Sequence, residues 1–355
     1  MTDSLDILVL GAAYGLLPAV RLSLGGNRVT VVCRENEREA LVERGASVTL
    51  QRRDGRDGRL LHAPAKPGRA QTGSVLGVVG PDVSTQGYDI VILAMSEPQY
   101  ADASVDALMA RIANKGLPVI SLMNLLPACF LRRLDQLDVD AMKPAYGSWD
   151  VWQRFDPDRV TAASPDAQAV RMHANRPDLL SVTLASNFKV APFHDDADQG
   201  LLAILEQSTA RIQPDDIPGP ARFVAHRSLG APLSKWPMLI AGNCRCMQVD
   251  GNVITIAAAV RDRLEESRRI YDAVANVAVA AGALTSDLVP FAAYASAARQ
   301  LTRPSSLARA LAAGAARVER IDLMILHAAR SLDMPFEEIA EISENIQSRV
   351  ERNLI

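Results

Sequence analysis

Short apolar runs alternate with helix-like stretches along the first third of the chain. Residues 7–10 form an apolar run that stops at Gly11, and the apolar positions after Gly15 fit a helix that ends near Gly25. A short apolar run that ends at a glycine is typical of a buried strand entering a tight turn. Alternation of this kind predicts an α/β fold with a doubly wound parallel sheet. The expected strands are 29–32, 47–50, 74–79, 89–95 and 118–123, and the expected helices are 16–24, 37–44 and 101–113.

The pattern changes near residue 141. From Leu233 onward almost every segment has helical periodicity, and Pro335 fits the first turn of the last helix. We therefore expect two domains, an α/β domain at 1–225 that is enlarged at 141–225 and an all-helical domain at 226–355. The enlarged region has strand-like pieces at 159–163, 169–173, 180–184 and 188–192 and a helix at 199–211, and the long C-terminal helices are expected at 257–281, 305–330 and 335–350.

Length and composition agree with two globular domains. The 355 residues exceed the size at which one hydrophobic core usually keeps growing, and 48% of them are apolar. The formal net charge is −3 and the basic residues are scattered, which excludes the electrostatic footprint of a nucleic-acid or acidic-membrane binder. The expected partner is a small molecule. Alanine-rich stretches around Ala278 and Ala312 also allow close helix packing, within the chain or in a homodimer.

The cysteines predict neither disulfides nor a metal site. There are four, and their uneven spacing does not fit a secreted disulfide framework in a chain of this length. Cys244 and Cys246 lack the further cysteines or histidines that would complete a tetrahedral metal site. The chain begins with Asp3 and Asp6 rather than with the basic residues of a secretory signal. We expect a cytoplasmic protein without a bound metal.

A glycine turn follows the first expected strand. Gly11-Ala12-Ala13-Tyr14-Gly15 stands where a dinucleotide-binding fold presents backbone N–H groups to a pyrophosphate. The turn departs from the usual G-x-G-x-x-G fingerprint, because Ala13 occupies the middle glycine position and the segment is one residue short. A Rossmann-type nucleotide site is the functional interpretation of these five residues, and an ordinary strand–helix turn is the alternative.

Arg34 ends the second expected strand, where a side chain normally meets the ribose of the adenosine. A guanidinium suits the additional phosphate of NADP, whereas an acidic side chain would accept the ribose hydroxyls of NAD. Glu35 follows directly and leaves NAD open. Arg34 therefore favours NADP as the cofactor, with a solvated strand-end arginine as the alternative.

Later segments carry polar residues in an order that matches a known family. Together with the glycine turn and Arg34, they resemble the ketopantoate reductase family over nearly the whole chain. The chain departs from that family at Ser96, where the family has lysine, at Leu239, where it has asparagine, and at Leu307, where it has methionine. The segments are 92–99, Leu122-Met123-Asn124, Lys235 with Asn243 eight residues later, Pro304-Ser305-Ser306 and Glu319-Arg320-Ile321-Asp322.

The resemblance implies that the protein uses NADPH to reduce a 2-oxo acid to the 2-hydroxy acid. Such a reduction needs a hydride donor, a proton donor at the carbonyl oxygen and a group that holds the carboxylate. By the resemblance, Asn124 lies beside both cofactor and substrate. The other residues expected to contact the cofactor in this region are Ala94, Met95 and Ser96.

The same resemblance assigns roles to five residues nearer the C-terminus. Lys235 is the proton donor, because a buried lysine has a lowered pKa and its ammonium can give up a proton near neutral pH. Glu319 would hold and tune Lys235, and Asn243 would line the substrate cleft from the same helix face. Ser305 and Ser306 would bind the substrate carboxylate. Each residue also has an ordinary alternative, as a surface charge, a helix cap or a core amide.

The substrate is not fixed by the sequence. The stretch between Asn124 and Lys235 is longer than the family usually has, so the substrate need not be ketopantoate itself. Two other functions stay open. One is an opine-type enzyme, which reduces an imine and tends to use a histidine as its acid, although His226 is expected to be structural rather than catalytic. The other is a non-catalytic sensor or scaffold that binds NADP.

Overall fold

The computed structural model describes residues 4–51, 58–66, 77–163, 169–183, 186–212, 221–334 and 336–355. The chain divides into two compact units. The N-terminal unit contains residues 1–95, 99–123 and 150–226, and the C-terminal unit contains residues 96–98, 124–149 and 227–355. Sequence reasoning gave all of 1–225 to the first domain, whereas two short segments of that range group with the C-terminal helices. In the described parts of the chain, no helix combines the length and the hydropathy needed to span a membrane.

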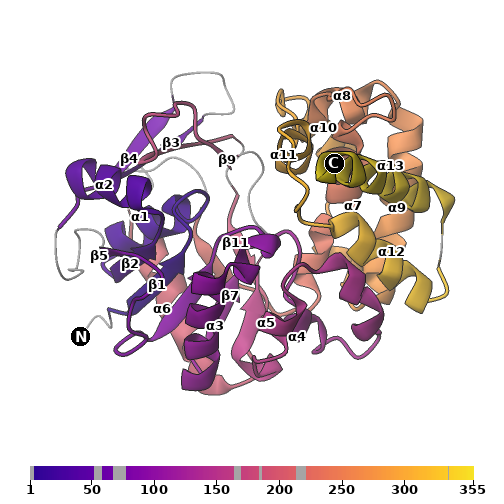
Figure 1. Cartoon of the computed structure of the whole chain (residues 1–355). Helices are drawn as coiled ribbons and strands as arrows, with labels where there is room; N and C mark the ends of the chain where they lie inside the picture. The colour runs from indigo at the N-terminus through magenta and orange to yellow at the C-terminus, as the bar shows by residue number, and fades with distance from the viewer. Residues whose placement is uncertain are drawn as a thin grey trace. The chain divides into compact units, whose positions relative to one another are not determined.

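A six-stranded parallel sheet forms the centre of the N-terminal unit (Figure 1). The strand β1 lies between β2 and β6, with Leu8 opposite Thr30 on one side and opposite Val91 on the other. The chain order reverses at β1, and open sheets of this kind bind ligands in the crevice at the carboxyl ends of the strands at that reversal. Across the sheet the strands are β5 (Gly77–Val79), β2 (Arg28–Val32), β1 (Asp6–Leu10), β6 (Ile90–Leu93), β7 (Val119–Ser121) and β8 (Val160–Ala162).

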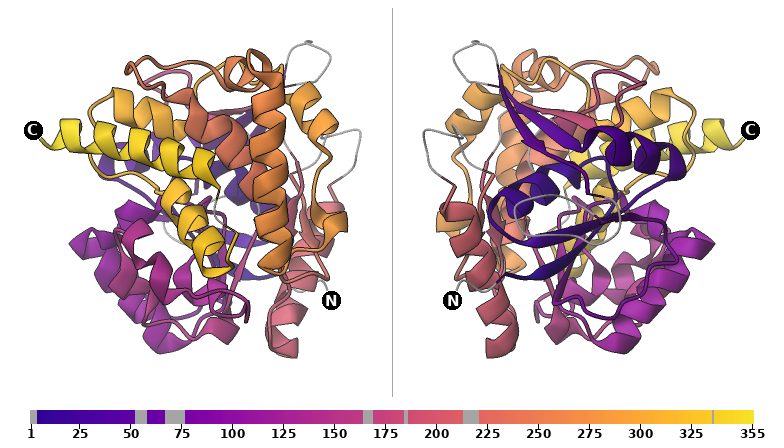
Figure 2. Two further views of the ribbon diagram at one scale, coloured as in Figure 1. Left: turned by 90° about the vertical axis from the view of Figure 1, so that its right-hand side faces the viewer. Right: turned by 90° about the vertical axis from the view of Figure 1, so that its left-hand side faces the viewer.

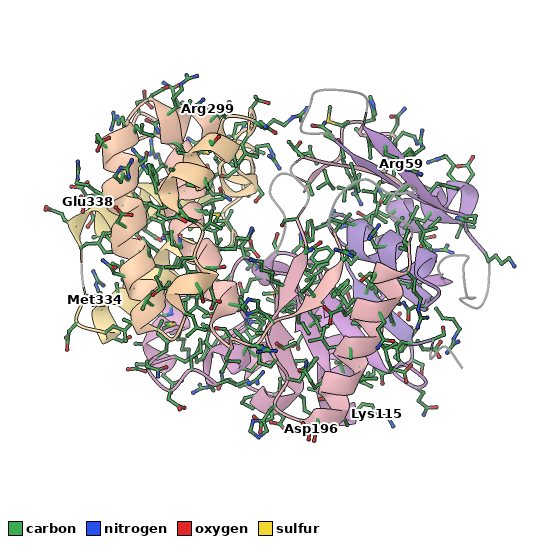
Figure 3. All side chains as sticks on the ribbon, turned by 180° about the vertical axis from the view of Figure 1, so that it is seen from behind. Arg59, Lys115, Asp196, Arg299, Met334 and Glu338 are labelled. Carbon is green, nitrogen blue, oxygen red and sulfur yellow. The ribbon has the colours of Figure 1, made fainter. Side chains whose placement is uncertain are left out.

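The helices of the N-terminal unit begin and end at residues that favour such boundaries. The helix α3 (Ala103–Lys115) begins where the Asp102 carboxylate accepts the N–H of Ser104, and it ends at Gly116, whose φ of 65° is left-handed. Helix ends carry exposed charges, among them Lys115 and Asp196 (Figure 3). The other helical segments that include residues of this unit are α1 (Leu16–Leu24), α2 (Glu35–Arg44), η1 (Glu97–Ala101), α5 (Trp149–Trp152), η3 (Pro157–Arg159) and α6 (Asp196–Ala210).

The predicted strand at 47–50 exists but belongs to a second sheet. It pairs antiparallel with the strand that follows it and parallel with a strand from the enlarged region 141–225. The edge of the main sheet next to β2 is formed by β5 instead. The strand predicted at 74–79 is described only from residue 77. The second sheet has the order β4 (Arg59–Ala63), β3 (Ala46–Leu50), β10 (Leu179–Val182) and β9 (Ala169–Val170), and a separate pair is formed by β11 (Phe188–Val190) and β12 (Phe223–Ala225).

The C-terminal unit is helical, as predicted for 226–355. Its longest helices are α9 (Leu264–Ala280) and α13 (Glu337–Leu354), which both appear in the left view of Figure 2. The apolar stripe predicted for the last helix is buried at Ile339 and Ile346. The shorter helical segments are α4 (Ala128–Leu131), η2 (Asp140–Ala145), η4 (Ala231–Lys235), α7 (Trp236–Met238), η5 (Leu239–Asn243), η6 (Cys244–Cys246), α8 (Ile256–Arg261), η7 (Thr285–Asp287), α10 (Phe291–Ala298), α11 (Ser306–Ala312) and α12 (Ile321–Ser331).

Two of the long predicted helices are each divided in the structure. The helix expected at 257–281 breaks at Asp262 and Arg263, because Arg263 leaves helical geometry with φ −133° and ψ 62°. The helix expected at 305–330 stops before Gly314, whose φ of 88° is left-handed, and the chain becomes helical again only at Ile321. Gly314, which stands inside an apolar pattern, therefore marks the end of a helix that was predicted to continue. Pro335 lies outside the described residues.

Candidate functional site

The glycine turn closes tightly between β1 and α1. Gly11 has a φ of +103°, which side chains rarely tolerate, and its N–H donates to the Val32 carbonyl at 2.9 Å. A Cβ atom on Gly15 would lie 2.0 Å from the Gly11 carbonyl oxygen, so only glycine fits there. The helix α1 begins at the next residue, and its first N–H groups bind carbonyls of the turn: Leu17 donates to Tyr14 at 3.1 Å and Ala19 donates to Gly15 at 3.0 Å. The close backbone approach that the two glycines allow is the feature that the nucleotide interpretation requires of the turn.

The three residues inside the turn differ in exposure. Ala12 is buried, Ala13 is exposed, and Tyr14 is partly buried with its ring edge-on to Phe188, at a centroid distance of 6.5 Å. Ala13 is the residue that departs from the glycine fingerprint. Because it is exposed, its additional methyl group causes no packing conflict within the turn.

Ala94 and Met95 lie against the glycine turn, as the nucleotide interpretation requires. The Ala94 N–H donates to the Leu10 carbonyl at 3.0 Å. A Cβ atom on Gly11 would meet the Met95 Cγ at 2.5 Å, and one on Gly15 would meet the Ala94 Cβ at 3.2 Å. The two glycines thus allow the turn to pack closely against the residues that follow β6. Ser96, which is exposed, is the first residue of the segment 96–98 in the C-terminal unit.

Arg34 is exposed at the start of α2, directly after β2. Its backbone N–H donates to the Glu37 carboxylate at 2.9 Å. Among the described residues, no carboxylate forms an ion pair with the Arg34 guanidinium. Glu35, which could have favoured NAD, is exposed and paired with Arg38. The end of β2 therefore carries an exposed cation.

Arg171 is a second cation beside the turn, and sequence reasoning did not find it. Its guanidinium donates to the Ala12 carbonyl at 2.9 Å and pairs with Glu37 at 2.7 Å. Arg171 thus joins the glycine turn to the start of α2 and offsets the charge of the buried Glu37. No motif marks this arginine, because it follows β9 of the second sheet, more than a hundred residues later in the chain.

Glu319 and Asn124, both predicted site residues, are brought together in the C-terminal unit. The Glu319 carboxylate accepts hydrogen bonds from the Asn124 side chain and the Leu125 backbone, and from the N–H of Glu97 at 3.2 Å. Burial of the carboxyl group raises the pKa of Glu319 to about 7, and the nearby charge of Glu97 raises it further against these hydrogen bonds. Glu319 can therefore hold or release a proton near neutral pH. The expected pairing of Glu319 with Lys235 stays a prediction.

Glu97 is the partner that the sequence did not indicate. It is fully buried, and its carboxylate accepts the N–H of Gly147 at 3.0 Å and the N–H of Ser148 at 2.8 Å. The Ser148 hydroxyl donates to the same carboxylate. These bonds fasten segment 96–98 to residues 147–148, and the Glu97 N–H then reaches Glu319. Glu97 therefore positions Glu319.

Lys235 and Asn243 lie on one helical segment, as predicted, but its geometry is mixed. Lys235 ends the 3₁₀ turn η4, and the segment continues as the short α-helix α7 and the π-helix η5, of which Asn243 is the last residue. From residue 231 to 244 only Lys235, Met238 and Asn243 are not buried. The segment thus presents both predicted residues on its accessible part. Leu239, which replaces the family's asparagine, is buried.

Ser305 and Ser306 have different roles. Ser305 is buried at the N-cap of α11, where its hydroxyl accepts the N–H of Ala308 at 3.1 Å and donates to the Asn243 carbonyl at 2.8 Å. Its single proton is therefore used within the protein. Ser306 is exposed and is the residue of the two whose hydroxyl is available to a ligand.

A separate cavity of about 390 Å³ lies in the C-terminal unit and contains none of the predicted site residues. It is lined by residues of η6, α8, α9 and α13, among them Arg245 and Glu266. Arg245 pairs with Glu266 at 2.9 Å. Among the described residues, no three histidine, cysteine, aspartate or glutamate side chains gather into a group that could hold a metal ion.

Comparison with known proteins addresses the fold. No protein-family model matches the sequence. No curated protein sequence matches it either. Among solved structures, the PanE/ApbA family ketopantoate reductase from Ralstonia eutropha JMP134 is similar over 99% of this chain and 100% of its own, with a TM-score of 0.64 and 18% identity. The 2-dehydropantoate 2-reductase from Methylococcus capsulatus is similar over 98% of both chains, with a TM-score of 0.63 and 16% identity.

The chain has the ketopantoate reductase fold. An octopine dehydrogenase in complex with NADH and agmatine is also similar, over 98% of this chain and 90% of its own, with a TM-score of 0.52 and 15% identity. The ketopantoate reductase fold confirms the predicted class, a Rossmann-type sheet followed by a helical C-terminal part. At identities this low, the likeness is one of fold, and the chemistry has to be argued from the residues.

Proposed function

We propose that the protein is an NADPH-dependent reductase that converts a 2-oxo acid to the 2-hydroxy acid. The observation that carries the proposal is the segment 235–243, in which Lys235 and Asn243 are accessible polar residues and Met238 is the only other residue that is not buried. A lysine and an amide that are both accessible in a mostly buried segment can reach one ligand. The hydrogen-bonded pair of Glu319 and Asn124 in the same unit supports the same reaction.

The N-terminal unit supplies the groups that would hold the cofactor. The glycine turn would receive the pyrophosphate, and the Arg34 guanidinium would pair with the additional phosphate that distinguishes NADP from NAD. Glu35 does not compete, because it is paired with Arg38. NADPH, when bound, supplies the hydride that reduces the carbonyl carbon.

The residues of the C-terminal unit would manage the proton and hold the substrate. The Lys235 ammonium donates a proton to the carbonyl oxygen as that oxygen gains negative charge. Asn243 and Asn124 hydrogen-bond the substrate, and the exposed Ser306 hydroxyl binds its carboxylate. Glu319 keeps Asn124 in place through the hydrogen bond between their side chains.

The test is the loss of NADPH absorbance when the purified full chain is mixed with a panel of 2-oxo acids that differ in branching and size. We expect at least one branched 2-oxo acid to be reduced and NADH to be the poorer donor. A protein that binds neither NADPH nor NADH would end the proposal. A protein that binds NADPH but reduces nothing would support a sensor instead.

An imine reductase is the second candidate, because the fold is also that of the octopine dehydrogenase. This candidate needs an amine in addition to the oxo acid. The same panel is therefore measured with and without amino acids and agmatine. Turnover that depends on the amine and survives Lys235→Ala would favour the imine reductase, whereas turnover without the amine favours the 2-oxo acid reductase.

A further inference from the structure

A π-helical turn separates Lys235 and Asn243, the two accessible polar residues of segment 235–243. The π-helix Leu239–Asn243 follows α7, and the N–H of Cys244 donates to the Leu239 carbonyl five residues earlier. Single π turns inside α-helices are rare and occur frequently at functional sites. Here the turn lies between Lys235 and Asn243.

The π turn changes which residues share a face. In a regular α-helix of about 100° per residue, eight residues leave Lys235 and Asn243 about 80° apart around the axis. A π turn contains one residue more than an α turn. The rotation about the helix axis from Lys235 to Asn243 is therefore roughly that of seven α-helical residues, and the two positions come within about 20° of each other. The irregular turn therefore places Lys235 and Asn243 on one face.

Side chains hold this turn by binding its carbonyl groups. The Tyr294 hydroxyl donates to the Met238 carbonyl at 3.1 Å, and the Ser305 hydroxyl donates to the Asn243 carbonyl at 2.8 Å. The carbonyls of Ala241 and Gly242 also accept side-chain bonds, from Arg245 at 3.3 Å and from Cys246 at 3.5 Å. The geometry of the segment thus depends on residues far from it in the chain.

Tyr294 reaches the segment through a space that only glycine leaves. A Cβ atom on Gly242 would lie 2.1 Å from the Tyr294 hydroxyl oxygen, which is far inside van der Waals contact. Tyr294 is 5% exposed, and its ring is stacked on Tyr271 at a centroid distance of 5.4 Å, so it has little room to turn away. Burial also raises the pKa of Tyr294, so the hydroxyl remains a donor.

We propose that Tyr294 is a positioning residue, whose hydroxyl holds the π turn that brings Lys235 and Asn243 onto one face of the helix. Gly242 provides the space for that hydroxyl. The inference rests on the proposed function, because it assumes that Lys235 and Asn243 act on one substrate.

The first test is Tyr294→Phe in the full chain, which removes the hydroxyl and keeps the ring. We expect kcat for the 2-oxo acid to fall at least about tenfold, because small displacements of catalytic groups cost large factors in rate. The KM for NADPH should stay unchanged. The matched control is Tyr271→Phe, since Tyr271 stacks on the same ring and its hydroxyl donates to the Val289 carbonyl instead. This control should keep its kcat.

The second test separates position from packing. Gly242→Ala should lower both kcat and the melting temperature, because the new methyl group meets the Tyr294 hydroxyl. In the double variant Gly242→Ala with Tyr294→Phe, the methyl group takes the place of the hydroxyl. We expect the melting temperature to recover while kcat stays low, a result that a purely structural role for Tyr294 would not give.

The rate of amide hydrogen exchange at residues 239–244 measures the stability of the π turn, and it needs no substrate. We expect faster exchange there in Tyr294→Phe and unchanged exchange in Tyr271→Phe. Unchanged exchange in Tyr294→Phe, or a kcat within about twofold of the wild type (well under 1 kcal/mol in barrier), would overturn the inference. A wild-type protein that reduces no substrate would overturn the proposed function instead, and the exchange experiment would still decide whether Tyr294 holds the turn.

Discussion

Two carboxylates, Glu97 and Glu319, lie together in the C-terminal unit and are stabilised to different degrees. Glu97 receives two backbone N–H groups and a hydroxyl. Glu319 has a raised pKa, because its burial and the charge of Glu97 outweigh the hydrogen bonds that it accepts. Glu319 is therefore a carboxyl group that titrates near neutral pH.

The raised pKa of Glu319 predicts how stability changes with pH. The pKa of Glu319 is raised from 4.5 to about 7, so between these values the folded protein holds a proton that the unfolded chain has released. The contribution of Glu319 to stability is then greatest below pH 4.5 and is lost as the pH rises toward 7. Urea unfolding should show a decline in stability across this window for the wild type and a smaller decline for Glu319→Gln. Equal slopes for the two proteins would contradict the raised pKa.

Arg34 determines the choice of cofactor in our proposal. Replacing it by glutamine removes the cation that would meet the additional phosphate of NADP, so the Kd for NADPH should rise about tenfold or more while the Kd for NADH changes little. Titration of each nucleotide followed by fluorescence measures both values. The control is Arg38→Gln, because Arg38 lies on the same helix and pairs with Glu35. Equal losses for NADPH and NADH would contradict the role of Arg34.

At the level of elements, the start of α11 links a helix cap to the segment 235–243. Ser305 caps α11 and also binds the Asn243 carbonyl, whereas Ser306 is exposed. Ser305→Ala should therefore lower the free energy of unfolding by about 1 kcal/mol. Ser306→Ala should leave stability unchanged and raise the KM for the 2-oxo acid. Chemical denaturation and steady-state kinetics on both variants check this, and the reverse assignment of the two effects would refute it.

The elements that the sequence predicted best are those whose pattern is local. The buried strands at the centre of the main sheet, the helix 16–24 and the final helix all follow from apolar runs and their ends. The position of β3 in a second sheet could not be predicted, because pairing depends on strands from the enlarged region more than a hundred residues away. The helix end at Arg261 was missed because no glycine or proline marks it, and the end at Ala312 was missed because Gly314 stands inside an apolar pattern.

The same limit applies to the candidate site. Motifs indicated the glycine turn, Arg34, Lys235, Asn243 and Glu319. They did not indicate Glu97, Arg171 or Tyr294, because each of these acts through a contact with a segment distant in the chain. The π turn was hidden as well, since it results from side chains that bind carbonyl groups of the helix and not from the spacing of residues within it.

At the scale of the whole molecule, the two compact units divide the proposed work. The N-terminal unit contains the glycine turn with Arg34 and Arg171, and the C-terminal unit contains Lys235 and Glu319. The chain passes between the units several times, because segments 96–98 and 124–149 belong to the second unit. Asn124 and Glu97 reach Glu319 by way of these segments.

The central claim is that Lys235 supplies the proton for reduction of a 2-oxo acid. The most direct measurement is the rate of NADPH oxidation by the preferred 2-oxo acid for the wild type, Lys235→Ala and the exposed control Lys115→Ala. Our account predicts that kcat falls about 10²- to 10⁴-fold in Lys235→Ala, while Lys115→Ala matches the wild type. It would be contradicted if Lys235→Ala, folded and able to bind NADPH, reduced the same substrate at the wild-type rate.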